Sequence, residues 1–172
     1  MATETLDQNE LSAAIDEVVL QMLKLMSSLD ENEINIVPYK NSWTAGQLFR
    51  HVTKSTNGIA KAMRKDAIPA ERDADERVPE LKKTFLDFSI KMKSPDFIVP
   101  EAGIYEKQAA IENLKKSFEN LIKNLINQNL NDLVTNLPIG EITKLEMLHF
   151  VLYHTQRHLH QMEKICEALK NK

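Results

Sequence analysis

Apolar side chains recur at three- and four-residue spacing over four long stretches of the chain. This spacing places them on one face of an α-helix, which has 3.6 residues per turn. The pattern predicts helices over about residues 9–29, 44–65, 107–127 and 143–170. The first of them has its apolar stripe at Leu11, Ile15, Val18, Val19, Met22, Leu23 and Met26. Four helices that each carry one apolar face favour an all-α protein.

Two of these helices begin with a capping-box sequence. In "TAGQ" the hydroxyl of Thr44 can accept a hydrogen bond from the backbone N–H of Gln47, and the side chain of Gln47 can accept one from the backbone N–H of Thr44. The sequence "TKLE" has the same pair in Thr143 and Glu146. Each box satisfies two backbone N–H groups that have no partner inside the helix. The second and fourth helices are therefore predicted to start at these threonines.

A long connection, about residues 66–106, separates the second and third helices. Residues 79–93 within it are amphipathic and predict a shorter helix, whereas the rest holds three prolines and is expected to be irregular. The prediction is an all-α four-helix bundle with one long crossover, forming a single domain over residues 1–172. The core of such a bundle is a common place for metal and cofactor sites.

Composition agrees with this architecture and narrows the function. The 172 residues include only four glycines and six prolines, which suits long helices. A net charge of -3 gives no basic surface for nucleic acid. No signal peptide or membrane span is expected, because the first residues lack a basic and an apolar region and no apolar run is long enough. The one cysteine cannot form an internal disulfide. A reducing cytoplasm is therefore expected.

Four of the five histidines lie in "HFVLYHTQRHLHQ" on the fourth predicted helix. At about 100° per residue, His154 and His158 fall one turn apart in the middle of the apolar stripe. His149 and His160 fall on the opposite side and are expected to face water. The fifth histidine, His51, lies at the edge of the apolar stripe of the second helix.

Two imidazoles on an apolar face are unfavourable unless each polar nitrogen has a partner. Each could hydrogen-bond inside the core, but neutral histidines at i and i+4 can also bind one divalent metal together. If His51 turns inward, three histidines from two helices converge. Three such ligands match a catalytic metal site with an open position. The candidate ligands are His51, His154 and His158.

Other motifs in this region fit known sites less well. "HTQRH" has Thr155 where a zincin metalloprotease needs its glutamate. "EMLH", from Glu146 to His149, has Glu-x-x-His spacing, but it occurs once and is expected to face outward, whereas a di-iron bundle needs two inward copies. Cys166 lies on the apolar side and is expected to be a buried structural thiol.

Two further residues are low-ranking candidates for substrate binding. Arg157 lies between the inward histidines and off the apolar face, so it could form a salt bridge or hold a substrate carboxylate. Trp43 directly precedes the second helix, where it could staple the helix start or line a pocket mouth.

Taken together, "SWTAGQLFRH" and "LPIGEITKLEMLHFVLYHTQRHLHQ" resemble the DinB-like (damage-inducible) superfamily of bacterial metal-binding bundles, and the likeness covers nearly the whole chain. The resemblance implies an up-up-down-down-like bundle, frequent homodimers and one divalent metal, often zinc or nickel. Position by position, the ligands it implies are His51, His154 and His158.

The family includes thiol-dependent S-transferases and isomerases that use low-molecular-weight thiols, and proteins described as metal-dependent hydrolases. Thiol transfer is therefore the leading expectation, with a small-molecule substrate and a thiol as co-substrate. Hydrolysis, or a non-catalytic helical interaction module, remain the alternatives. The sequence identifies no catalytic side chain beyond the metal ligands.

Overall fold

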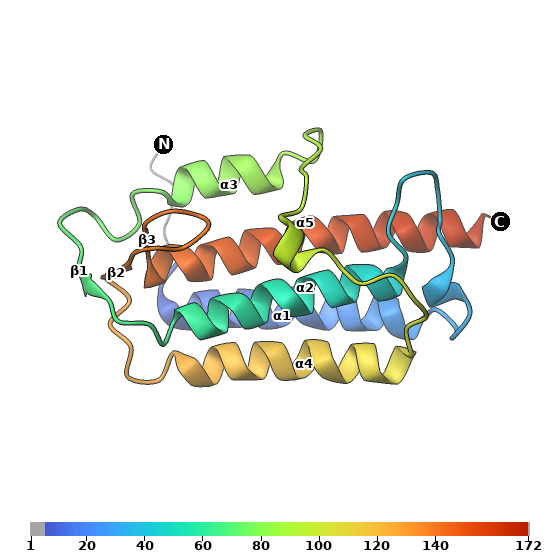
Figure 1. The fold of residues 1–172 in the computed structure, drawn as a ribbon, viewed down its shortest axis with the longest axis horizontal. Helices are drawn as coiled ribbons and strands as arrows, with labels where there is room; N and C mark the ends of the chain where they lie inside the picture. The colour runs from blue at the N-terminus through green and yellow to red at the C-terminus, as the bar shows by residue number, and fades with distance from the viewer. Residues whose placement is uncertain (1–5, 172) are drawn as a thin grey trace.

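The computed structural model describes residues 6–171 and consists mainly of four long helices that lie side by side (Figure 1). They are α1 (Gln8–Ser27), α2 (Ala45–Ala62), α4 (Lys107–Asn124) and α5 (Lys144–Lys170). The predicted four-helix bundle is confirmed. Within the described residues, none of these helices combines the length and apolarity that a membrane span requires.

The order of helix directions differs from the expected up-up-down-down arrangement. Followed by colour in Figure 1, α1 and α5 run one way, and α2 and α4 run the other way. α1 packs on α5, α2 packs on α4, and α2 also contacts α5. The crossover, residues 63–106, returns the chain to the end where α2 began, so α2 and α4 are parallel.

Both predicted capping boxes are present. Gln47 N–H donates to Thr44 Oγ1 at 3.1 Å, and Thr44 N–H donates to Gln47 Oε1 at 3.0 Å. The matching distances for Thr143 and Glu146 are 3.1 and 2.9 Å. α1 begins with a third box, between Asp7 and Glu10. These contacts fix where each helix starts and therefore which side chains its core-facing stripe contains.

The crossover contains α3 (Val78–Leu86), which packs along α5 on the outside of the bundle (Figure 1). The helix predicted over residues 79–93 is wrong beyond Leu86. There Asp87 adopts an extended conformation, and its carboxylate accepts from the N–H and hydroxyl of Ser89. This local turn competes with the helix. A single 3₁₀ turn, η2 (Asp96–Ile98), follows and contacts α2.

A small antiparallel sheet ties the crossover to the start of α5. Its strands are β1 (Ile68–Pro69), β2 (Asp132–Val134) and β3 (Ile142–Thr143), in the order β1-β2-β3. Leu133 lies between Ile68 and Thr143 in the register. Strands of two or three residues are too short to show an alternating pattern, so they could not be predicted from the sequence.

The third predicted helix ends earlier than its apolar pattern suggested. α4 stops at Asn124, and Asn127 then adopts a left-handed conformation with φ of 62°. Asparagine tolerates this region better than most residues. The apolar side chain of Leu125 is nevertheless buried, which explains why the pattern continued past the helix end.

Candidate metal centre

Three histidines from two helices meet in the interior of the bundle. His51 comes from α2, and His154 and His158 come from successive turns of α5. The Nε2 atom of His51 lies 3.3 Å from that of His154 and 3.0 Å from that of His158. The Nε2 atoms of His154 and His158 lie 3.1 Å apart. All three side chains are buried.

Two of the rings are oriented by hydrogen bonds on their other nitrogen. His51 Nδ1 lies 3.0 Å from the carbonyl oxygen of Ile98, which can only accept, so Nδ1 carries the proton. His158 Nδ1 donates in the same way to Gln161 Oε1 at 3.0 Å. In neutral rings of this tautomer, Nε2 presents a bare lone pair. Hydrogen bonds of this kind orient metal-ligating histidines in many proteins.

The Nε2 triangle fits a divalent metal ion. Nitrogen ligands that lie about 2.0–2.1 Å from a tetrahedral ion are roughly 3.3 Å apart, and the observed separations are 3.0, 3.1 and 3.3 Å. Lone pairs that face one another at this range repel unless a cation lies between them. The three buried histidines can thus hold one metal ion.

The electrostatics of the centre keep the rings neutral. Burial lowers the pKa of His51, and it lowers the pKa of His158 to about 3. Burial likewise lowers the pKa of His154, and the neighbouring histidines add to this effect. Neutral imidazole is the form that binds a metal, so the ligands need not lose a proton near neutral pH.

The sequence model of the DinB superfamily matches residues 14–162, which include all three histidines. The chain belongs to the DinB superfamily. No curated protein and no solved structure gave a significant match.

Aromatic rings lie beside the histidine cluster of this DinB protein. The centroid of the Trp43 ring lies 4.8 Å from that of His51, so Trp43 lies beside a candidate ligand at the start of α2. Phe150 stacks on His154 with centroids 5.2 Å apart, and Phe85 of α3 approaches the same ring at 6.0 Å. The candidate ligands therefore lie in a largely apolar environment.

Arg157 lies beside the cluster, and its guanidinium is bound to backbone. Its Nη1 donates to the carbonyls of Phe85 and Asp87 at 3.2 and 3.0 Å, and its Nη2 donates to the carbonyl of Ile90. These partners lie in the crossover, so the side chain fastens that segment to α5. Three of its five N–H donors are thus engaged by backbone carbonyls, and its role in holding a substrate carboxylate remains a prediction.

The expectation that His149 faces water is wrong, because its side chain is buried and only 1% exposed. His149 points away from the core of the four-helix bundle, but α3 packs on the outer side of α5 and covers it. His149 Nδ1 lies 3.2 Å from the hydroxyl of Tyr153, and its Nε2 has no hydrogen-bond partner. His160 remains partly exposed and stacks on Phe88 at 4.2 Å.

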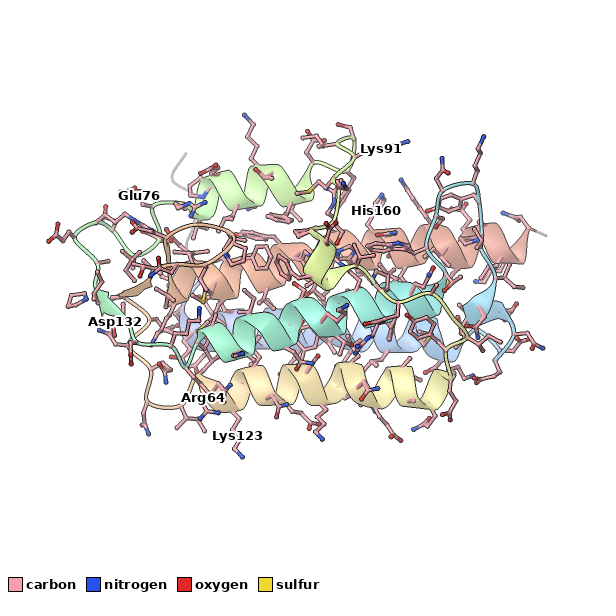
Figure 2. All side chains as sticks on the ribbon, viewed as in Figure 1. Arg64, Glu76, Lys91, Lys123, Asp132 and His160 are labelled. Carbon is pink, nitrogen blue, oxygen red and sulfur yellow. The ribbon has the colours of Figure 1, made fainter. Side chains whose placement is uncertain are left out.

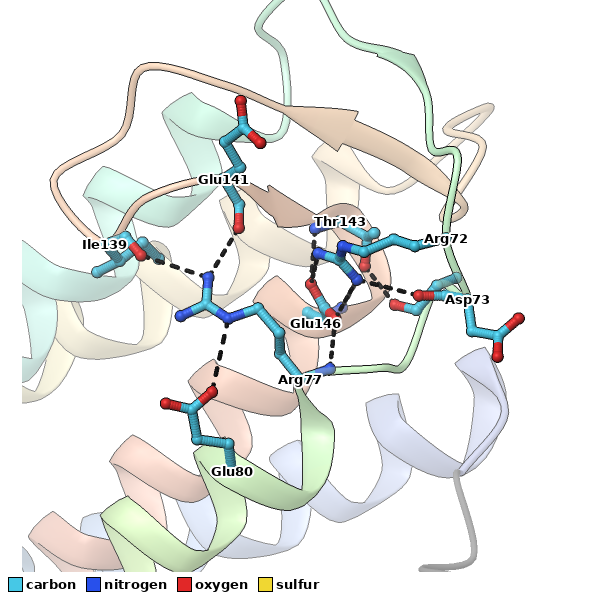
Figure 3. Close-up of polar contacts among 9 residues, drawn as sticks. Arg72, Asp73, Arg77, Glu80, Ile139, Glu141, Thr143 and Glu146 are labelled. Carbon is cyan, nitrogen blue, oxygen red and sulfur yellow. Dashed lines mark hydrogen bonds and ion pairs between the residues drawn. The ribbon is translucent and has the colours of Figure 1, made fainter.

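Glu146, the first residue of "EMLH", is also buried rather than outward-facing (Figure 3). Both of its carboxylate oxygens accept from Arg72 at 2.7 Å. The backbone N–H groups of Arg77 and Thr143 donate to the same carboxylate at 2.8 and 2.9 Å. This glutamate locks the crossover onto the first turn of α5 and is not free to act at the histidines.

Cys166 is buried and has no disulfide partner, as the sequence predicted. Burial raises the pKa of its thiol, which makes the thiolate form less accessible.

Sequence reasoning missed the groups that orient the ligands. Gln161 lies three residues after His158 on the same helix, a spacing that could have revealed it. The carbonyl of Ile98 and the hydroxyl of Ser94, 3.4 Å from His51 Nδ1, come from the irregular crossover. No local sequence pattern predicts which backbone carbonyl will accept a hydrogen bond from a distant side chain.

Proposed function

We propose that this protein is a metal-dependent enzyme that holds one divalent cation, zinc or nickel, on His51, His154 and His158. The convergence of three Nε2 atoms within 3.3 Å of one another carries the proposal. Three neutral ligands leave the charge of the cation uncompensated and leave a coordination position for a further group.

The proposed reaction is transfer of a thiol to a small electrophilic acceptor. A cation in this centre would lower the pKa of a thiol or a water molecule bound at the open position. Activation of water also benefits from a general base. Glu146 is engaged by Arg72 and two backbone N–H groups, and Glu101 is exposed and paired with Arg50 and Lys54. A free thiol, with a pKa of about 8.5, is far more acidic than water, so a thiol bound to a cation could lose its proton to solvent without such a base, and these engaged carboxylates favour thiol transfer over hydrolysis.

The chain's own residues supply a shielded setting for this chemistry. The aromatic rings of Trp43, Phe85 and Phe150 lie around the ligands and limit the access of bulk water. A low local dielectric strengthens the influence of the cation on a bound thiol. The buried free thiol of Cys166 suits a reducing cytoplasm, where a small thiol co-substrate is available.

The test begins with the metal content of untagged protein after incubation with zinc or nickel. About one equivalent per chain is expected, with loss of binding in His158→Ala. His160→Phe is the matched control, because it keeps a flat ring beside Phe88 and removes imidazole nitrogens outside the cluster. Less than roughly a tenth of an equivalent in the wild-type protein would contradict metal binding and leave a non-catalytic bundle.

The cobalt-substituted protein then distinguishes the two reaction classes. Cysteine or glutathione should shift the d–d absorption bands, and small carboxylates and esters should not. The opposite result would favour a hydrolase. A homodimer and a small-molecule substrate remain predictions, and light scattering of the purified protein measures the oligomeric state directly.

A further inference from the structure

Residues 87–101, here called the strap, cross from α5 to α2 and contact His51 of the histidine cluster through Ile98 and Ser94. Figure 1 shows the strap as the yellow-green segment that carries η2 across the middle of the bundle. The strap begins directly after α3 and includes no regular helix other than η2. The strap therefore lies against the candidate metal centre.

On the α5 side the strap is held mainly by Arg157. The guanidinium donates to the carbonyls of Asp87 and Ile90, and to that of Phe85 just before the strap begins. A planar guanidinium offers five donors in a fixed fork, so one side chain can fix three carbonyls at once. Lysine at this position would keep the positive charge but would lack the planar set of N–H donors that binds several carbonyls.

On the α2 side the strap is held by a candidate metal ligand and two cations. His51 Nδ1 donates to the carbonyl of Ile98 at 3.0 Å. One turn later, Lys54 donates to the carbonyl of Val99 at 2.8 Å. Glu101 at the end of the strap accepts from Lys54 at 3.0 Å and from Arg50 at 2.8 Å.

The His51–Ile98 hydrogen bond joins the strap to the metal centre. A cation on Nε2 withdraws electron density from the ring and strengthens donation from Nδ1. Conversely, a fixed acceptor holds the ring in the orientation that presents Nε2 to the cation. A contact that holds the strap in place therefore favours metal binding, and metal binding in turn favours the ordered position of the strap.

We propose that Arg157 is a positioning residue that sets metal affinity through the strap, with no contact to the metal or substrate. This inference rests on the proposed function, since it requires that the three histidines bind a metal. Arg157 also carries a positive charge, and it directly precedes the candidate ligand His158 in the chain. That charge opposes a bound cation, so the two effects of Arg157 on affinity have opposite signs.

The opposite signs make the test decisive. Zinc affinity is measured by competition with a chromophoric chelator for the wild type, Arg157→Gln and Arg157→Lys. We expect zinc to bind roughly fivefold more weakly to both variants, a smaller loss than the 10- to 100-fold typical of direct ligand partners. If charge alone mattered, Arg157→Gln would bind more tightly and Arg157→Lys would be unchanged.

Hydrogen exchange of the full-length protein gives a second readout that does not depend on activity. Zinc should slow exchange of the strap amides in the wild type, and should slow it less in Arg157→Gln. Arg64→Gln is the matched control, because Arg64 is exposed and lies on the side of the bundle away from Lys91 and His160 (Figure 2). This control should bind zinc and protect the strap as the wild type does.

Three results would overturn the inference. Unchanged or tighter zinc binding in both Arg157 variants would remove the link to the metal. Hydrogen exchange of the strap amides that is the same with and without zinc would also remove this link, even if the Arg157 variants bind zinc more weakly. If the wild type itself binds no zinc or nickel, the proposed function fails and this inference fails with it. Circular dichroism of each variant shows that it is folded before affinities are compared.

Discussion

The Nε2 atoms of His51 and His158 lie 3.0 Å apart, although the Nδ1 atom of each ring is the one that donates a hydrogen bond. Neither Nε2 then has a proton to share with the other. The fold brings two lone pairs together in a buried position, which costs free energy without a cation between them. Folding and metal binding are therefore expected to support each other.

Trp43 should report metal binding directly. It is the only tryptophan in the chain, and its ring lies 4.8 Å from that of His51. Cobalt or nickel, which quench nearby fluorophores, should lower its fluorescence with an end point at about one ion per chain. Titration of His154→Ala should show no such end point, and a chelator should restore the signal in the wild type. Quenching that is equal in the variant would mean that the ion binds elsewhere.

Replacing Glu146 with glutamine should destabilise the fold and leave the metal centre unaffected. Burial would raise the pKa of this carboxyl, but Arg72 and the backbone donors of Thr143 and Arg77 outweigh burial and hold the pKa below its usual value. Loss of a buried ion-pair partner costs about 3–5 kcal/mol, and the partial exposure of Arg72 reduces this to roughly 2–3 kcal/mol.

Urea unfolding at pH 7 measures this loss, and zinc stoichiometry checks the metal centre. Glu80→Gln is the control, because that carboxylate is 72% exposed and lies 3.9 Å from Arg77. The control should change stability by no more than about 0.5 kcal/mol. The contribution of Glu146 should also decline as the pH falls below the ordinary carboxyl range, and it vanishes below the lowered native pKa, where both states are protonated. A stable Glu146→Gln protein would show that the crossover is held by other contacts.

His149 should make the protein sensitive to mild acid. Burial lowers the pKa of this imidazole to about 4, although Asp75 and Glu146 act in the opposite direction and Lys82 reinforces the effect. Between that value and the ordinary pKa of about 6.5, the unfolded chain binds the proton more readily than the native state. Stability from this residue is therefore complete above pH 6.5 and declines as the pH falls.

At pH 5 the decline from His149 should amount to about 1–2 kcal/mol. His149→Phe replaces the ring with an apolar one of similar size and removes the Nε2 atom that has no partner. Denaturant unfolding at pH 7 and pH 5, with chelator present, should give a smaller pH difference for His149→Phe than for the wild type. If the unfolding free energy changes equally between pH 7 and pH 5 in both proteins, groups other than His149 cause the acid sensitivity.

The sequence by itself determined the four long helices and the inward pair His154 and His158. Both results depend on short-range regularity, because apolar spacing and capping boxes act within a few residues of one helix. The choice of His51 as the third candidate ligand needed only the added assumption that a bundle brings the second and last helices together. The structure places its Nε2 within 3.3 Å of the other two.

The tertiary structure decided what covers the outer side of α5. Their positions around the helix predicted that Glu146 and His149 face outward. In the structure, α3 and Arg72 of the crossover cover this side of α5, and both residues are buried. It also decided that Arg157 binds three carbonyls of an irregular segment and that Ile98 supplies the acceptor for His51. Contacts between residues tens of positions apart leave no periodic trace in the sequence, because they depend on where a long connection lies once the helices have packed.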